Sequence, residues 1–145
     1  MDYRKSASIG AIVLGVLLIV GGFTTWTLVR SELAAQHITT TDDACLAGRE
    51  VKGPFTAWCQ ADVIDQHALE STDGLTYAQL DREDPRRATA MNASFLRASL
   101  YTSIVAFGLS AMSVAMGIVF ILIGLGIRDV SQVVHPEASR AERVG

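Results

Sequence analysis

The feature that most constrains this chain is a stretch of 30 residues without a charged side chain, from Ala98 to Ile127, between Arg97 and Arg128. As an α-helix rising about 1.5 Å per residue it would be roughly 45 Å long, whereas the hydrocarbon core of a bilayer is about 30 Å thick. A second apolar stretch, Ile9 to Val29, is also long enough to span a membrane. The sequence therefore predicts an all-α membrane protein with two transmembrane helices.

Composition agrees with this prediction, since half of the 145 residues are hydrophobic and the mean hydropathy is +0.32. The apolar excess is confined to the two stretches. Between them, residues 30–97 hold seven Lys or Arg against eleven Asp or Glu. A clustered basic face, which nucleic-acid binding requires, is missing, so we expect lipid rather than nucleic acid as a partner.

The first apolar stretch could also be read as a signal peptide, because Arg4 and Lys5 form a basic segment before it. Its apolar run is longer than that of a signal peptide, and no small-residue cleavage site follows directly. We therefore interpret it as an uncleaved transmembrane helix.

The expected organisation has five segments. They are an N-terminal tail (1–8), a first transmembrane helix (9–29), a mostly helical loop domain (30–97), a second transmembrane helix (98–127) and a disordered tail (128–145). Within the loop domain, Pro54 suits the first position of an amphipathic helix that reaches Glu70. Asp84 suits the N-cap of a long helix that continues into the second transmembrane segment.

Small side chains recur along the second transmembrane helix at alternating steps of four and three residues, which returns them to one face. Small residues let helix backbones approach closely in lipid, although such residues are common in any membrane helix. The first helix has a similar face, with Ala7, Ala11, Gly15, Leu18, Gly22 and Thr25, so the two helices are expected to pair as an antiparallel hairpin. We call the following set the small-residue stripe: Ser99, Ser103, Ala106, Ser110, Ser113, Gly117 and Gly124.

Orientation follows from the basic residues at the membrane ends. Five of them precede the first helix or follow the second, and four lie at the loop ends. Because a loop longer than about 60 residues is largely exempt from this count, the N-terminal pair and the C-terminal tail decide the orientation. We expect a multi-pass protein of the bacterial plasma membrane, with both termini cytoplasmic and the loop domain outside. The basic residues counted are Arg4, Lys5, Arg128, Arg140 and Arg143, against Arg30, Arg86, Arg87 and Arg97.

Cys45 and Cys59 are the only cysteines, and both lie in the loop domain. An even pair in an exported segment is typical of an oxidising compartment, so we expect a disulfide between them. Spacing alone does not establish the geometry, and two free cysteines remain the alternative.

Motifs that carry catalytic or cofactor chemistry are missing. The three histidines, His37, His67 and His135, fall on both expected sides of the membrane, and no metal-binding spacing of Cys or His occurs. Neither transmembrane stretch contains an ionisable residue of the kind that marks an ion pathway. We expect no catalytic residue, no metal and no cofactor, and we do not expect an enzyme.

Five short motifs of the loop domain and the following helix stand out: GPFTA from Gly53, QADVI from Gln60, HALE from His67, TDGLTYA from Thr72 and MNASFLRASL from Met91. With these motifs the chain resembles a family of small two-helix actinobacterial membrane proteins that often carry an automatic label of aromatic ring-opening dioxygenase, small subunit. The resemblance covers most of residues 29–126, although the two cysteines are not part of the family's pattern. Such dioxygenases are soluble and hold iron through histidines and a carboxylate, which this chain cannot assemble, so we regard the label as unreliable.

The favoured hypothesis is a structural or accessory membrane protein whose outer loop domain docks onto an envelope or membrane-complex partner. The alternative is a small homo-oligomeric pore or transport accessory, with Ser and Thr lining the pore.

Overall fold

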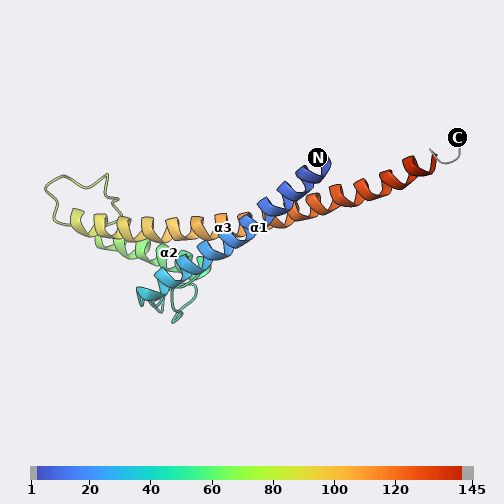
Figure 1. Cartoon of the computed structure of the whole chain (residues 1–145). Coiled ribbons are helices and arrows are strands. Elements are labelled where there is room, and N and C mark those ends of the chain that lie inside the picture. The colour runs from blue at the N-terminus through green and yellow to red at the C-terminus, as the bar shows by residue number, and fades with distance from the viewer. Residues whose placement is uncertain (1–2, 142–145) are drawn as a thin grey trace. The chain divides into compact units, whose positions relative to one another are not determined.

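The computed structural model describes residues 3–141, with side chains as far as Asp129. Three helices follow one another: α1 (Tyr3–Ala35), α2 (Pro54–Ser71) and α3 (Arg87–Ala141) (Figure 1). Among these described residues no strand occurs, and the only strand-like pairing is an isolated antiparallel bridge between Thr39 and Glu50. The prediction of an all-α chain is confirmed.

Two of the helices are long and apolar enough to cross a membrane. They are α1 and the part of α3 from Arg87 to Asp129, and the most apolar 18-residue stretch of each has a mean hydropathy of 2.3. Only 17% of each stretch is buried inside the protein. The core helix of a soluble protein would instead be mostly buried, so these helices expose the apolar surface that a bilayer would cover.

The helix ends differ from the expected ones. α1 runs from Tyr3 to Ala35 and so extends beyond the expected transmembrane segment (9–29) at both ends; it stops before His37, whose φ of 51° an α-helix cannot accommodate. α3 continues as a helix to Ala141, where we expected a disordered tail from residue 128. Residues 127–135 contain neither glycine nor proline, and extending an existing helix is far easier than starting one. Residues 142–145 lie outside the described part.

The chain divides into two compact units. The first unit comprises residues 1–24 and 109–145, and the second comprises residues 25–108. In the first unit, α1 and α3 run antiparallel, because residues later in α1 contact residues earlier in α3. Each step is seven residues on both helices, the repeat that keeps one face of a helix against its neighbour. These contacts pair Ser8 with Gly124, Gly15 with Gly117, and Gly22 with Ser110.

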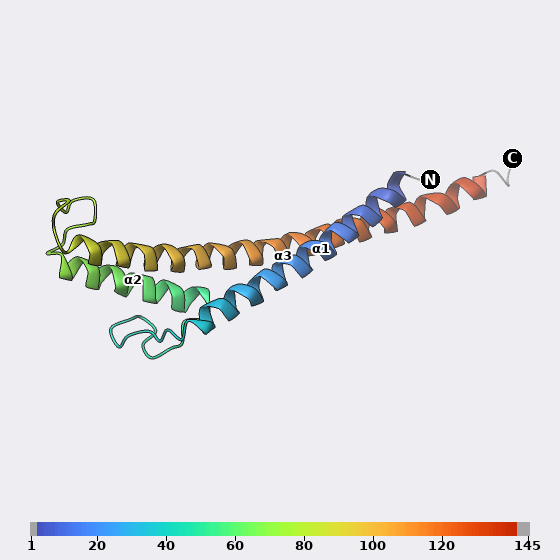
Figure 2. The same ribbon diagram turned by 60° about the vertical axis from the view of Figure 1, so that its left-hand side comes forward.

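The second unit has a core built where α2 packs beside the first part of α3 and the last part of α1. Figure 2 shows α2 alongside this part of α3. The Trp26 and Phe107 rings meet edge to face with centroids 4.7 Å apart. Phe107, which is 1% exposed, is the largest fully buried side chain in the described chain. The buried residues of this core are Leu33, Val51, Ala57, Ala61, Leu100 and Phe107.

Local sequence signals explain where α2 and α3 begin. Pro54 occupies the first turn of α2, as predicted, since its fixed φ suits a helix start and its missing N–H has no helical partner to lose. The Thr56 hydroxyl accepts the backbone N–H of Gly53 at 3.2 Å. Asp84 lies three residues before the first residue of α3, and its carboxylate accepts the backbone N–H of Arg86 at 2.9 Å, so the predicted capping bond forms in the turn that leads into the helix.

Candidate functional site

The small-residue stripe lies partly in each of the two units. In the first unit, Ser110, Gly117 and Gly124 are buried, and Ser113 is half-buried. All four contact α1 through the contacts described below. The remaining members, Ser99, Ser103 and Ala106, belong to the second unit, where Ser99 is exposed and the other two are half-buried.

Four glycines of the first unit lie so close to the opposite helix that no side chain fits. A Cβ built on Gly117 would lie 2.6 Å from the Gly15 carbonyl oxygen, and one built on Gly15 would lie 2.5 Å from the Gly117 carbonyl oxygen. Cβ positions on Gly22 and Gly124 would lie 2.8 and 2.9 Å from backbone oxygens of the other helix. Each contact is with main chain, which cannot rotate aside as a side chain can, so glycine is required at these positions.

Two serine hydroxyls join the same two helices. Ser8 Oγ donates to the Gly124 carbonyl oxygen at 2.7 Å, and Ser113 Oγ donates to the Leu18 carbonyl oxygen at 2.9 Å. Ser8 is 3% exposed, so its hydroxyl has no access to water or lipid headgroups in this position. Such bonds between helices contribute roughly 0.6 kcal/mol each in a membrane.

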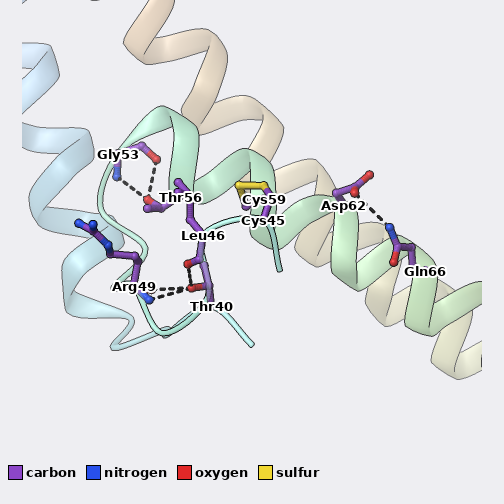
Figure 3. Close-up of a disulfide and its surroundings, with 9 residues drawn as sticks. All are labelled: Thr40, Cys45, Leu46, Arg49, Gly53, Thr56, Cys59, Asp62 and Gln66. Carbon is purple, nitrogen blue, oxygen red and sulfur yellow. Dashed lines mark hydrogen bonds between the residues drawn. A yellow bond between two sulfur atoms is a disulfide. The ribbon is translucent and has the colours of Figure 1, made fainter. Parts of the chain in front are cut away.

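A disulfide joins Cys45 to Cys59, with Cα atoms 5.4 Å apart (Figure 3). Cys59 is 4% exposed and packs with Ala44 and Val63 in a small apolar cluster. The bond fastens the loop between α1 and α2 onto the second turn of α2. The sequence predicted this pair, and the structure supplies the proximity that spacing alone could not.

The same loop is held by a network around Thr40, which is 3% exposed. Its hydroxyl donates to the Leu46 carbonyl oxygen and accepts the Arg49 backbone N–H at 2.9 Å (Figure 3). The backbone N–H of Thr40 donates to the Arg49 carbonyl oxygen, also at 2.9 Å. The backbone of Arg49 is thus fixed from both sides, and its side chain leaves from a rigid position.

A groove of about 340 Å³ lies between this loop, the end of α1 and the first turn of α2. Three of its lining residues are basic: Arg30 from α1, and Arg49 and Lys52 from the loop. Neither arginine side chain makes a hydrogen bond or ion pair with any residue of the described part of the chain. Phe55, at the edge of this basic groove, is 79% exposed.

One acidic residue lines the basic groove. Glu50 accepts a hydrogen bond from Lys52 Nζ at 2.7 Å, and both side chains are 43% exposed. The pKa of Glu50 lies below its usual value, chiefly because of Lys52 and to a smaller extent because of His37 and Arg30 nearby. The carboxylate is therefore charged at neutral pH and offsets one of the three cations, which leaves the groove positively charged.

α2 is joined to α3 by polar and aromatic contacts. Arg97 Nη1 lies 2.6 Å from Asp65 Oδ1, and the Trp58 and Tyr101 rings meet edge to face at 5.7 Å. Further along, the Arg87 guanidinium lies 4.0 Å from the centroid of the Tyr77 ring. The first two contacts fix α2 along the part of α3 that precedes and enters the charge-free stretch, and the third holds the loop between α2 and α3 against the start of α3.

Large apolar side chains on this part of α3 remain uncovered. Phe95 is 66% exposed, Leu96 52% and Met91 40%. All three precede Arg97 and so lie outside the charge-free stretch. Phe95 and Met91 are four residues apart, which places them on one helix face. Leu96 follows Phe95 and lies about 100° further around the helix. We call Met91 and Phe95, together with this neighbour, the α3 apolar face.

In the part of the chain that is described, no three His, Cys, Asp or Glu side chains gather at one place. His67 instead pairs with one carboxylate, its Nε2 lying 2.6 Å from Asp43 Oδ2 on the surface. The pKa of Asp43 lies below its usual value, first because of a hydrogen bond with the Thr41 side chain and second because of the hydrogen bond with His67. The third histidine, His135, lies where side chains are not described.

Sequence reasoning did not find the basic groove. Arg30 is far from Arg49 and Lys52 along the chain, and the loop as a whole is acidic, which hides the local positive charge. One usable signal was the run Arg49 to Gly53, which carries two of the three cations immediately before a helix start.

Compared with models of protein families, with curated proteins and with solved structures, the chain has no match. The resemblance to the two-helix membrane family therefore stays an interpretation of the sequence.

Proposed function

We propose that this chain is an integral membrane protein of the accessory type, whose second unit docks onto a protein partner in the same membrane. The observation that carries the proposal is the α3 apolar face. Water-exposed apolar side chains of this size, when grouped, are typical of interaction sites. Because Met91, Phe95 and Leu96 lie just outside the charge-free stretch, a partner that covers them would itself project from the membrane.

In this proposal, α1 and α3 cross the bilayer as an antiparallel hairpin. Support comes from the close glycine contacts between them and from the apolar side chains that face outward. Leu109, Met112 and Leu122 are each more than half exposed, as lipid-facing residues would be. The loop domain then lies outside the cytoplasm, and Arg4, Lys5 and Arg128 lie on the cytoplasmic side.

The pore alternative receives less support. A pore would need hydroxyl groups facing a channel, but Ser8 and Ser113 donate to backbone carbonyls of the paired helix. The large exposed side chains between residues 9 and 23 and between residues 109 and 125 are instead apolar.

A photo-crosslinking amino acid at position 95, incorporated in cells, tests the docking proposal. We expect one dominant adduct with a different membrane protein, identified by mass spectrometry. The matched control places the same amino acid at Asp81, an exposed loop residue of the same unit, where no such adduct should form. Adducts only with copies of this chain would favour the homo-oligomer, and equal adducts from both positions would remove the claim of a docking face.

A further inference from the structure

We propose that the basic groove binds the phosphate headgroup of an anionic phospholipid. The groove is formed by Arg30, Arg49 and Lys52 together with the first turn of α2. This inference rests on the membrane insertion proposed above, but not on the α3 apolar face. It assigns a ligand class to a part of the molecule that the docking proposal does not use.

The position of the groove relative to the bilayer follows from the length of the uncharged part of α1. Residues 6–29 contain no charged side chain, and Arg30 is the first charge after them. At about 1.5 Å per residue these 24 residues extend roughly 36 Å, slightly more than the hydrocarbon core. Arg30 therefore lies at the level of the lipid phosphates, and every other residue that lines the same groove lies close to that level.

The chemistry of the groove suits a phosphate diester. Arg30 and Arg49 offer planar guanidinium groups that no carboxylate of the described chain occupies, and this geometry matches phosphate oxygens. Lys52 is partly neutralised by Glu50, so the two arginines supply most of the attraction. Gly53 has no side chain to cap α2, so no side chain there competes with an anion for the first-turn N–H groups.

Aromatic residues beside the groove suit the remainder of a lipid molecule. Phe55 lines the groove and is 79% exposed; Trp58, one turn further along α2, does not line the groove and packs against Tyr101, but is still 55% exposed. Water contact with such rings is unfavourable, whereas aromatic side chains are enriched at the membrane interface. A phospholipid with its phosphate in the groove could lay its glycerol and upper acyl chains against these rings.

The groove is also formed before any ligand arrives. Thr40 holds the backbone of Arg49 through two hydrogen bonds of 2.9 Å, and the disulfide to Cys59 anchors the same loop on α2. In Figure 3, Arg49 extends away from the disulfide, on the side of Gly53 and Thr56. A preformed site loses less conformational entropy when it binds.

The test uses the full-length protein in mild detergent, titrated with phosphatidylglycerol or with phosphatidylcholine of the same acyl chains and followed by native mass spectrometry. We expect tighter binding of phosphatidylglycerol. Arg49→Gln should weaken it about fivefold, the effect expected of one arginine near an anionic membrane surface. Arg82→Gln removes the same charge from an exposed position of the loop between α2 and α3 and should leave the affinity for phosphatidylglycerol unchanged.

Arg30→Gln should weaken binding as Arg49→Gln does, and it keeps the test decisive if one variant folds poorly. Excess inorganic phosphate should not displace the lipid. Equal affinity for the two lipids, equal effects of Arg49→Gln and Arg82→Gln, or full displacement by inorganic phosphate would each overturn the proposal. Alkaline carbonate extraction of cell membranes distinguishes a failure of the lipid-binding proposal from a failure of membrane insertion. Release of the protein by carbonate would refute membrane insertion itself.

Discussion

Replacing Gly117 by alanine introduces one methyl group where the structure has no space for it. The new Cβ would lie 2.6 Å from the Gly15 carbonyl oxygen and 2.7 Å from Ile19 Cγ1. Ordinary contacts of a Cβ begin at about 3.4 Å, so α1 and α3 would have to separate by several tenths of an ångström. Gaps of that size forfeit a substantial part of the dispersion energy at every neighbouring contact.

Overpacking of this kind costs roughly 1–3 kcal/mol. The intrinsic helix preference of alanine over glycine, up to about 1 kcal/mol, acts in the opposite direction and offsets part of that cost. Gly126→Ala is the matched control, because no atom lies within 4 Å of a Cβ built there. We expect Gly126→Ala to be neutral or slightly stabilising, and Gly117→Ala to be destabilising.

Equilibrium unfolding in mild detergent, titrated with a denaturing detergent and followed by circular dichroism, measures the difference. Gly117→Leu should destabilise the protein further, since its side chain meets the same backbone. Leu109→Ile, at an exposed position of the same helix, should leave the midpoint unchanged. If Gly117→Ala and Gly126→Ala have the same midpoint, the close contact between α1 and α3 does not stabilise the protein.

Two further predictions concern the second unit. Reduction of the bond between Cys45 and Cys59 opens a loop of about 15 residues and should lower the free energy of unfolding by about 3 kcal/mol. Denaturation with and without reductant measures this difference. Two free thiols in protein from native membranes would contradict the pairing. Arg86 lowers the pKa of Asp84 below its ordinary 3.8, first through its side-chain hydrogen bond, so the folded state binds fewer protons. This stabilisation is present above pH 3.8 and is lost as the pH falls through the folded pKa; Asp84→Asn should abolish that part of the pH dependence in thermal unfolding.

Much of the fold could be predicted because single stretches of sequence determine it. The charge-free run after Arg97 predicts a long apolar helix by its length alone. Pro54 and Asp84 indicate helix starts through local backbone chemistry. The tail could not be predicted in this way, because the mixed charges after Arg128 are compatible with both a helix and a disordered segment.

The sites were predictable to different degrees for a physical reason. Steps of four and three residues place small side chains on one face, so the contacts of Gly117 and Gly124 followed from periodicity. Periodicity does not say where the pairing ends, and Ser99 is exposed in the second unit. The basic groove depends on Arg30 and Arg49 meeting through the loop fold, which no local pattern encodes.

The central claim is that α1 and α3 form a membrane hairpin with the second unit outside the cytoplasm. Single cysteines at Asp81 and Ser6, each in a Cys45→Ser/Cys59→Ser background, test it most directly with a membrane-impermeant thiol reagent. The account predicts that position 81 reacts in intact cells and that position 6 reacts only after lysis. Reaction of both positions in intact cells, or of position 81 only after lysis, would contradict it.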